Sequence, residues 1–215
     1  MGFKKSIKTS VLSLALISSM AYADGLKEEK SGGFVGLQAG TSLLQQKRDD
    51  HYRDNGSEYV NTYKYSYTTA AYGVLGGYEY WFSNSLGARG YALFSGANFY
   101  VMQFGVGADV IYNITNVADG NLGVVAGLQL GGVYWLNSWY WWGSSSNQNS
   151  LAFDMALNIG VRWTQNEHVI EVLGKIPFIE AHTGTRNYSS GSYNYKDEYY
   201  SKETFSFVAR YMYRF

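Results

Sequence analysis

The sequence contains no cysteine and only one proline, and charged residues make up 16% of its 215 residues. Without cysteine, the chain has no disulfide, no thiolate nucleophile, no zinc–thiolate site and no lipid-modified cysteine anchor. Low charge combined with 18% aromatic residues argues against intrinsic disorder, which requires high charge and few aromatic residues. The 25 glycines and 21 tyrosines also argue against a helix-rich fold, because both residues are poor helix formers.

The N-terminal stretch has the three parts of a secretory signal peptide. Its basic region is formed by Lys4, Lys5 and Lys8. An apolar stretch then runs from Val11 to Met20 and ends at the small-x-small cleavage site Ala21–Ala23, and it is too short to span a membrane as a helix. We therefore expect a signal peptide over residues 1–23 and a mature domain over residues 24–215. Removing three lysines and no acid changes the net charge from zero to −3, so a nucleic-acid-binding surface is not expected.

No apolar run after residue 23 approaches the ~18 residues that a transmembrane helix needs. Instead, segments of about ten residues alternate large apolar side chains with small or polar ones, which is typical of strands with two different faces. The alternation is clearest in Met102–Tyr112, Leu122–Leu130 and Phe153–Trp163. Five further segments complete a set of eight: residues 33–44, 70–82, 86–97, 168–179 and 203–215.

The residue types on the two faces indicate what each face meets. One face carries large apolar side chains without interruption, as contact with lipid requires. The other face is rich in Gly, Ala, Asn and Asp, which suits a narrow interior. The alternative is a soluble barrel of the lipocalin type, but its water-facing side would favour long charged side chains. In hydrocarbon every backbone polar group must be paired, so the sheet must close on itself. The sequence therefore predicts an all-β fold: a transmembrane, antiparallel, up-and-down β-barrel of eight strands.

The connections between these segments alternate in length, and this predicts the orientation in a bacterial outer membrane. Long polar loops at residues 45–69, 136–150 and 182–202 are expected outside, and short turns are expected in the periplasm together with both termini. The last segment ends with aromatic residues at period two. Tyr211, Tyr213 and Phe215 are interpreted as a C-terminal assembly signal that the barrel-assembly machinery reads.

Several stretches, in order along most of the mature chain, resemble the Helicobacter outer-membrane protein family. They are FGVGADVIYN at 104–113, LGVVAG at 122–127, LNIGVR at 157–162, GKIPF at 174–178 and YMYRF at 211–215. The resemblance implies a small outer-membrane β-barrel, because the family consists of such barrels, some described as porins and some as adhesins.

Projecting the alternation inward predicts an ionisable set in which four acids face four bases. The acids are Glu79, Asp109, Asp154 and Glu171, and the bases are Arg89, Arg162, Lys175 and Arg210. Since an unpaired buried charge is costly and eight strands leave room only for side chains, we expect a barrel-interior ionic network that closes the lumen. A narrow pore lined by the same charges is the alternative. Pro177 cannot donate to a strand ladder, so it is expected at a bulge or at a strand's outer end.

Aromatic residues are expected in two belts at the membrane interfaces. The periplasmic belt is predicted to contain Tyr78, Tyr80, Trp81, Tyr112, Trp163, Tyr211 and Tyr213, and the outer belt Tyr134 and Trp135. The third outer loop carries Trp139, Tyr140, Trp141 and Trp142, which either bind a surface ligand or lean back into lipopolysaccharide. Tyrosine also repeats at period two in the first and fourth outer loops, which are expected to continue the strands as hairpins above the membrane.

No phosphate-binding loop or dinucleotide fingerprint is present, and the three histidines are too scattered to form a metal site. The one local arrangement that could serve a hydrolase is His182 with Glu180 and Ser189 or Ser190, and no motif supports it. We expect no enzymatic activity and no cofactor. The predicted function is a structural outer-membrane protein whose aromatic-rich loops make surface contact, including adhesion to a host glycan or protein. A porin-like channel for small solutes is the alternative.

Overall fold

The computed structural model describes residues 25–54, 57–98, 101–136, 150–190 and 193–215. Residues 1–23, the predicted signal peptide, and the loop with Trp139, Tyr140, Trp141 and Trp142 lie outside these ranges. The described chain forms nine strands: β1 (Gly32–Asp54), β2 (Ser57–Trp81), β3 (Leu86–Ala97), β4 (Val101–Val117), β5 (Gly120–Trp135), β6 (Ser150–Gln165), β7 (His168–Pro177), β8 (Ala181–Ser190) and β9 (Tyr193–Arg214). Within these ranges no helix is long and apolar enough to cross a membrane.

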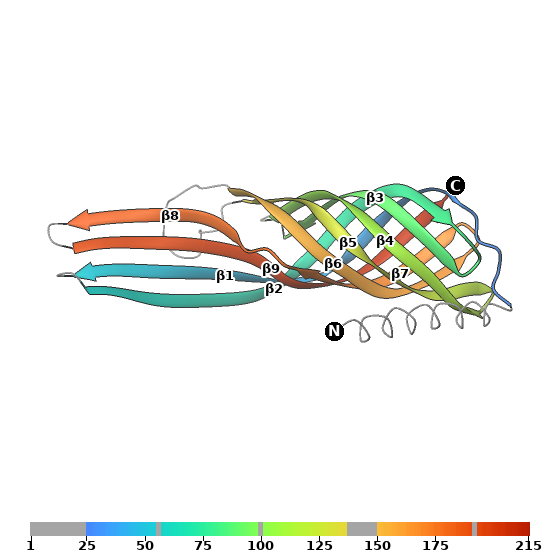
Figure 1. Ribbon diagram of the computed structural model, residues 1–215, viewed down its shortest axis with the longest axis horizontal. Coiled ribbons are helices and arrows are strands. Elements are labelled where there is room, and N and C mark those ends of the chain that lie inside the picture. Colours follow the sequence, from blue (N-terminus) through green and yellow to red (C-terminus); the bar gives the residue numbers. More distant parts are fainter. Residues whose placement is uncertain (1–24, 55–56, 99–100, 137–149, 191–192) are drawn as a thin grey trace, which may run out of the picture.

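The strands close into a ring in which every neighbouring pair is antiparallel (Figure 1). Each strand from β1 to β7 pairs with the next, β7 pairs with β9, and β9 pairs back with β1 from Phe34 to Arg53. β8 pairs only with the outer half of β9, whose inner half pairs with β7. β7 and β8 are therefore two halves of one wall strand. The predicted all-β, antiparallel, transmembrane barrel is confirmed, with a wall of eight strands.

Pro177 is the last residue of β7, where it faces Ala156 of β6. Because proline has no backbone N–H, the regular ladder ends there. The Phe178 amide still donates to the Met155 carbonyl at 2.8 Å, and β8 begins at Ala181 after a short break. The proline thus lies at the outer end of β7, at the break between the two halves of this wall strand, which agrees with one of the two expectations.

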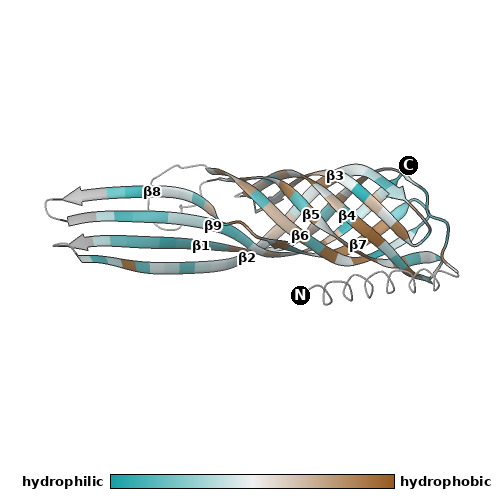
Figure 2. Cartoon of the chain, in the orientation of Figure 1, coloured by the Kyte–Doolittle hydropathy of each residue, from teal (hydrophilic) through white to brown (hydrophobic). Residues whose placement is uncertain are grey.

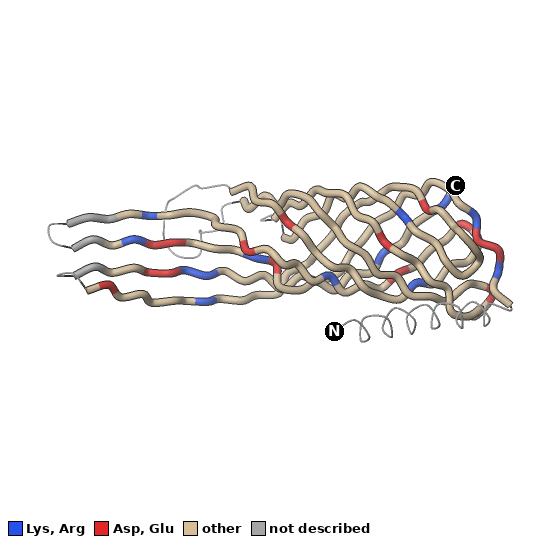
Figure 3. The backbone as a smooth tube through the Cα atoms, in the orientation of Figure 1, with Lys and Arg blue, Asp and Glu red and all other residues tan. Residues whose placement is uncertain are grey.

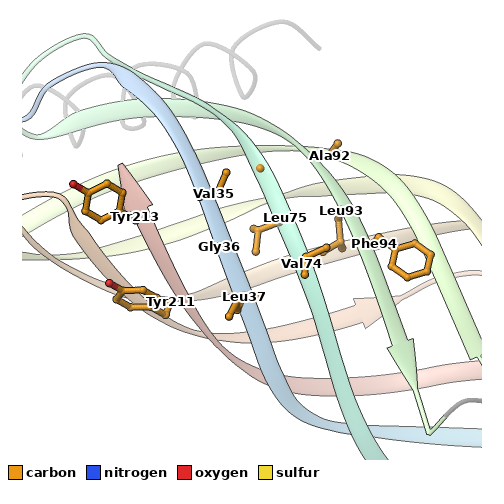
Figure 4. A pocket seen from close by; sticks show the side chains of 11 residues that line it. Val35, Gly36, Leu37, Val74, Leu75, Ala92, Leu93, Phe94, Tyr211 and Tyr213 are labelled. Carbon is orange, nitrogen blue, oxygen red and sulfur yellow. The ribbon is translucent and has the colours of Figure 1, made fainter. Parts of the chain in front are cut away.

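The outward face of the wall is a band of exposed apolar side chains. In Figure 2 the hydrophobic residues of the barrel strands are brown, and they recur along the barrel part of the chain. The band is built from the odd or even positions of each strand, for example Val35 and Leu37 of β1 and Phe104 and Val106 of β4. A groove of about 660 Å³ lies in this band beside β2 and β3, where the outward positions include Gly76 and Ala92 (Figure 4). Since the groove belongs to the apolar outward band of the wall, we assign it no aqueous ligand.

Beyond the barrel rim, β2, β1, β9 and β8 continue side by side as a four-stranded sheet (Figure 1). We call it the outer sheet and define it as residues 45–54, 57–67, 181–190 and 193–202. β1 and β2 stay in register up to Asp54 and Ser57, and β8 and β9 up to Ser190 and Tyr193. The first and fourth outer loops therefore continue the strands as hairpins, as predicted, and Figure 2 shows that this part is largely hydrophilic.

Two of the residues expected in the aromatic belts face the interior instead. Trp81 is 8% exposed and Trp135 is 2% exposed, so neither reaches the membrane interface. Both occupy the inward parity of their strands, next to Tyr80 and Tyr134 on the outward parity. The expectation was wrong for these two because it counted every aromatic residue near a strand end, whereas the alternation of a strand sends only every second one outward.

One irregularity in β9 decides which side chains enter the barrel. Leu43 of β1 faces Phe205, but Leu44 faces Glu203, so Thr204 is an extra residue that forms a β-bulge. A bulge shifts the alternation by one position. As a result Glu203 and Ser206 both face inward, although they are three positions apart in the sequence and strict alternation would send them to opposite faces.

Candidate functional site

The ionisable residues expected inside the barrel all lie in its interior, and none of them is more than 7% exposed. They are Glu79, Arg89, Asp109, Asp154, Arg162, Glu171, Lys175 and Arg210. Figure 3 shows that charges of both signs recur along the barrel between long uncharged stretches of wall. Every one of these residues is on the parity of its strand opposite to the apolar band. The interior is thus the first place to look for a function.

Two ion pairs cross the full width of the barrel. Arg162 of β6 donates two hydrogen bonds, of 2.6 and 2.8 Å, to the carboxylate of Glu79 on β2. Arg89 of β3 makes the same bidentate contact, with the same two distances, to Glu171 on β7. In a ring of eight strands, β2 lies opposite β6 and β3 lies opposite β7. The guanidinium groups therefore join opposite walls at the barrel centre.

The two pairs are linked to each other and to the wall. Arg162 also contacts Glu171 at 3.3 Å, and Arg89 also binds Asp109 on the neighbouring strand, at 2.7 and 2.8 Å. Below one guanidinium lies the Trp81 ring, whose centroid is 5.6 Å from the Arg162 carbon. Charge-assisted bidentate bonds are among the stronger contacts in proteins, and here each buried charge has an opposite partner. We call these five charged residues the central network.

A second polar layer lies nearer the outer rim and also joins opposite walls. Lys175 of β7 donates to Glu203 of β9 at 2.7 Å and to Gln103 of β4 at 2.6 Å. Gln103 in turn donates to Glu203 at 2.8 Å, although β4 and β9 lie opposite each other in the ring. Ser42 completes the layer with a hydrogen bond of 2.7 Å to Glu203. Asp154 is more distant, at 3.7 Å from the Lys175 nitrogen.

Arg210 lies between the two layers. Its Nε donates to Gln38 at 3.0 Å, and its guanidinium lies 4.0 Å from Glu171. The space between the layers is an internal cavity of about 20 Å³, lined among others by Gln38, Gln129 and Lys175. That volume is comparable to the ~10–15 Å³ that one water needs.

Both ends of the barrel are closed by other residues. At the outer rim Trp135 packs with Leu44, Val101 and Val133 in an apolar cluster. At the end that carries both termini of the mature domain, the chain before β1 folds across the mouth, where Glu29 accepts hydrogen bonds from the following residues: Asn113 at 3.0 Å, Asn121 at 2.9 Å and Arg214 at 2.6 Å. Interior glycines give the crossing side chains room: a Cβ at Gly107 would overlap the Tyr91 ring.

Sequence reasoning missed three interior charges, Glu29, Glu203 and Arg214. The inward facing of Arg214 could have been predicted, because it follows Arg210 and Met212 at the same alternation. The inward facing of Glu203 could not, since the bulge at Thr204 reverses the alternation before it. Glu29 precedes the first strand, where no periodicity applies.

The outer sheet has a tyrosine-rich face that is continuous with the barrel interior. Tyr52, Tyr59 and Tyr195 form one row across three strands, and the rings of Tyr52 and Tyr195 are 4.7 Å apart. The next row contains Asp50 and Asp197, which face each other across β1 and β9 with 0% and 3% exposure.

The environment of this carboxyl pair raises the pKa of Asp197 above its usual value. Burial is the largest cause, and the neighbouring carboxyl of Asp50 adds to it. The Tyr199 hydroxyl donates to Asp197 at 3.2 Å and opposes the shift. Asp50 itself is held by Arg48, at 2.5 and 2.7 Å. The outer sheet therefore combines exposed tyrosine rings with buried, hydrogen-bonded charges.

The described residues show no group of three or more histidine or acidic side chains placed to bind a metal ion. His182 contacts Thr185 at 3.1 Å and the Tyr200 ring. The residues expected to form the assembly signal, Tyr211, Tyr213 and Phe215, all point outward at the C-terminal end of β9. Tyr211 also hydrogen-bonds the His168 ring at 2.7 Å.

The sequence model of the Helicobacter outer membrane proteins matches residues 73–215, which include the barrel from β3 to the C-terminus and most of the membrane part of β2. The chain belongs to this family. Membership confirms the resemblance found in the sequence and places the protein in the outer membrane. No curated protein sequence matches this chain.

Solved structures agree with this family fold. The outer membrane protein OprG of Pseudomonas aeruginosa is 15% identical, with a TM-score of 0.50, and the match covers 87% of this chain and 97% of OprG. Neisserial surface protein A is 13% identical, with a TM-score of 0.39, and the match covers 87% of this chain and all of that protein. At these identities the likeness to OprG shows the barrel fold alone.

Proposed function

We propose that this family member is a non-enzymatic, closed outer-membrane barrel that anchors the outer sheet for contact with other surfaces and contributes to envelope structure. The observation that carries the proposal is the pair of bidentate ion pairs between opposite walls, Arg162–Glu79 and Arg89–Glu171. A conducting pathway along the axis must pass these side chains. The second polar layer and the Trp135 cluster obstruct the same axis farther out.

A porin-like channel is less well supported by the interior. The cavity between the two polar layers, at about 20 Å³, holds one water rather than a hydrated solute. Opening the lumen would require a guanidinium and a carboxylate to separate inside the barrel, and a buried unpaired charge costs several kcal/mol. Stable side-chain filling is what an eight-stranded barrel usually has.

In this proposal both termini are periplasmic and the outer sheet is outside the cell. The apolar band contacts outer-membrane lipid, and the residues above it contact lipopolysaccharide. The barrel-assembly machinery reads Tyr211, Tyr213 and Phe215 during insertion. A host glycan or protein is a candidate ligand of the tyrosine face, whose exposed rings and polar neighbours suit either. The candidate surface-binding loop with Trp139, Tyr140, Trp141 and Trp142 would add to that surface.

Planar-bilayer conductance of the refolded protein tests the closed barrel. We expect no steady current, because three layers of side chains obstruct the axis. A porin known to conduct, inserted in the same bilayer, serves as a positive control for the recording. A reproducible open-state current that does not occur in the same bilayer without the protein would overturn the closed barrel and favour the channel.

A barrel-only variant tests the role of the outer sheet. Gln46 and Tyr65 face each other, as do His182 and Tyr200, so Asn-Gly can replace residues 47–64 and 183–199 as two-residue hairpin turns. We expect wild-type protein on beads to bind host cells or a glycan array and the barrel-only variant to bind neither. Equal binding by both proteins would show that the sheet is not the contact surface.

A further inference from the structure

The groove in the outward apolar band follows a defined course across β9, β1, β2 and β3. Its lining includes two rows of register partners: Tyr213, Val35, Gly76 and Ala92 in one row, and Tyr211, Leu37, Val74 and Phe94 in the next. Such a row runs perpendicular to its strands, and barrel strands are tilted by about 35–45° from the barrel axis. The groove is therefore oblique to the membrane plane. It leads from Tyr213, next to the end of β9, to Ala92, six residues beyond the start of β3.

Small side chains make this part of the band hollow. Gly76 and Ala92 occupy outward positions that carry large apolar side chains elsewhere in the band. The inward-facing residues Leu75 and Leu93, each 5% exposed, also line the groove. Figure 4 shows larger apolar side chains around them. Because the lining is apolar and faces outward from the wall, it fits a hydrocarbon chain.

A polar cluster lies behind one end of the groove. The rings of Tyr211 and Tyr213 both contact the ring of His168, the first residue of β7, with centroids 5.9 and 5.6 Å away. The Tyr211 hydroxyl and His168 Nδ1 form a hydrogen bond of 2.7 Å. When that hydroxyl donates to Nδ1, Nε2 carries the ring proton and can donate to a ligand. Figure 4 shows the hydroxyls of both tyrosines directed away from the groove.

We propose that the groove binds one acyl chain of a phospholipid whose phosphate accepts hydrogen bonds from His168 Nε2 and the Tyr213 hydroxyl. Hydrogen bonds to a charged acceptor such as phosphate are stronger than those between neutral groups. His168 begins β7 and Tyr213 is the last residue but one of β9, so both lie at a barrel end, where lipid headgroups are expected. The oblique groove then leads the chain away from that end into the hydrocarbon.

The choice of phospholipid rests on the orientation in the proposed function. With both termini in the periplasm, this end of the barrel lies in the periplasmic leaflet, whereas lipopolysaccharide occupies the opposite leaflet. The site goes beyond that function in one respect: it predicts one lipid bound at a defined place, in addition to the lipid that surrounds the whole apolar band.

Native mass spectrometry of the refolded protein, titrated with phosphatidylethanolamine in detergent, measures the fraction that carries one bound lipid. Ala92→Phe fills the groove and should weaken binding about tenfold or more, because its ring occupies the space of the chain. Ala126→Phe, the same change at an exposed outward position of β5, is the matched control and should bind like wild type. Gly76→Leu is a second groove-filling variant that should weaken binding in the same way. A Cβ at this position meets no atom closer than 3.4 Å, so it replaces Ala92→Phe if that variant does not fold.

Diacylglycerol with the same acyl chains tests the headgroup contacts, because it lacks the phosphate. Wild-type protein should bind phosphatidylethanolamine about tenfold more tightly than diacylglycerol. His168→Phe keeps a ring against the two tyrosines but has no N–H group, so it should remove most of this preference. Tyr213→Phe should reduce the preference, because it removes the second donor.

Three outcomes would overturn the proposal. Equal binding by Ala92→Phe and Ala126→Phe would show that lipid covers the band without a site. Equal affinity of wild-type protein for the two lipids would show that the phosphate is not recognised, and tighter binding of lipopolysaccharide than of phosphatidylethanolamine would give the groove a different occupant. These failures are separable from failure of the proposed function, because bilayer conductance and binding to cells or glycans test the lumen and the outer sheet.

Discussion

Arg162 is 1% exposed and binds carboxylates on two other strands, Glu79 and Glu171. Replacing it with Leu leaves Glu79 buried with weaker compensation, and loss of one partner of a buried pair typically costs about 3–5 kcal/mol. We expect Arg162→Leu to lower the free energy of unfolding by that amount, measured by urea unfolding in lipid vesicles. Arg186→Leu, at an exposed position of β8, is the matched control and should have little effect. Equal urea midpoints for the two variants would contradict a stabilising central network.

A double substitution separates the ion pair from simple loss of packing. Removing both charges leaves no unpaired carboxylate at Glu79, so Arg162→Leu with Glu79→Leu should be more stable than Arg162→Leu alone. If the double variant is less stable by the sum of both single effects, the two side chains do not interact energetically.

Asp197 makes the stability of the outer sheet depend on pH. Its pKa is raised in the folded protein by burial and by the carboxyl of Asp50, while Tyr195 and Tyr199 oppose the shift. A group whose folded pKa is raised stabilises the fold fully below its unfolded pKa, 3.8, and this contribution is lost as the pH rises through the folded value. The outer sheet should therefore open more readily at pH 7 than at pH 4.

Hydrogen exchange of the outer-sheet amides, corrected for intrinsic rates, measures this opening at the two pH values. Asp197→Asn carries no charge at either pH, so it should remove most of the difference. Arg48 on β1 also faces the pair in the wild type, and its hydrogen bond to Asp50 raises its pKa, so it stays ionised at both pH values. Greater protection at pH 7 than at pH 4 in the wild type would show that the sign is wrong.

At the scale of strands, alternation correctly predicted that the eight ionisable residues expected inside the barrel face inward, since side chains on a strand alternate strictly and one wrong step would place a charge in lipid. Partner choice did not follow from it: Arg89 and Glu171 are 82 residues apart and meet only because β3 and β7 lie opposite each other in the closed ring. Glu203 escaped prediction because one extra residue, Thr204, reverses the period, and no local pattern marks a bulge.

The end of β9 carries a prediction about assembly. Phe215 is 74% exposed on the outward face, where it contributes little to the interior packing. We propose that its role is recognition, so Phe215→Ala should change the urea midpoint of refolded protein little but reduce, several-fold, the amount inserted by the barrel-assembly machinery in proteoliposomes. Phe207→Ala, an outward aromatic farther up the same strand, is the control and should insert normally. Equal insertion of both variants would argue against an assembly signal.

At the scale of the whole molecule, four wall strands serve two structures. β1, β2 and β9 form the barrel with one half and the outer sheet with the other, and β8 continues the wall strand that Pro177 ends. Yet the contacts that close the barrel lie below the rim. Among the central network, the layer around Glu203, the Glu29 cap and the Trp135 cluster, only the last includes residues of the outer sheet: Ala181 packs in that cluster and Tyr67 packs against it. The barrel therefore has its own core, and the sheet is an extension of it.

This separation predicts that the barrel-only variant folds with nearly the stability of the wild type. The two new hairpin turns follow directly on paired residues, and no charge of the interior loses its partner. We expect urea midpoints of the two proteins that agree closely, and wild-type hydrogen exchange in which the outer-sheet amides open without the barrel amides. Two outcomes would contradict this prediction: the barrel-only variant fails to insert, or the sheet and barrel amides exchange in one cooperative event. Either would show that the outer sheet is part of the barrel's folding unit, so that the regular strand pairing beyond the rim serves stability as well as binding.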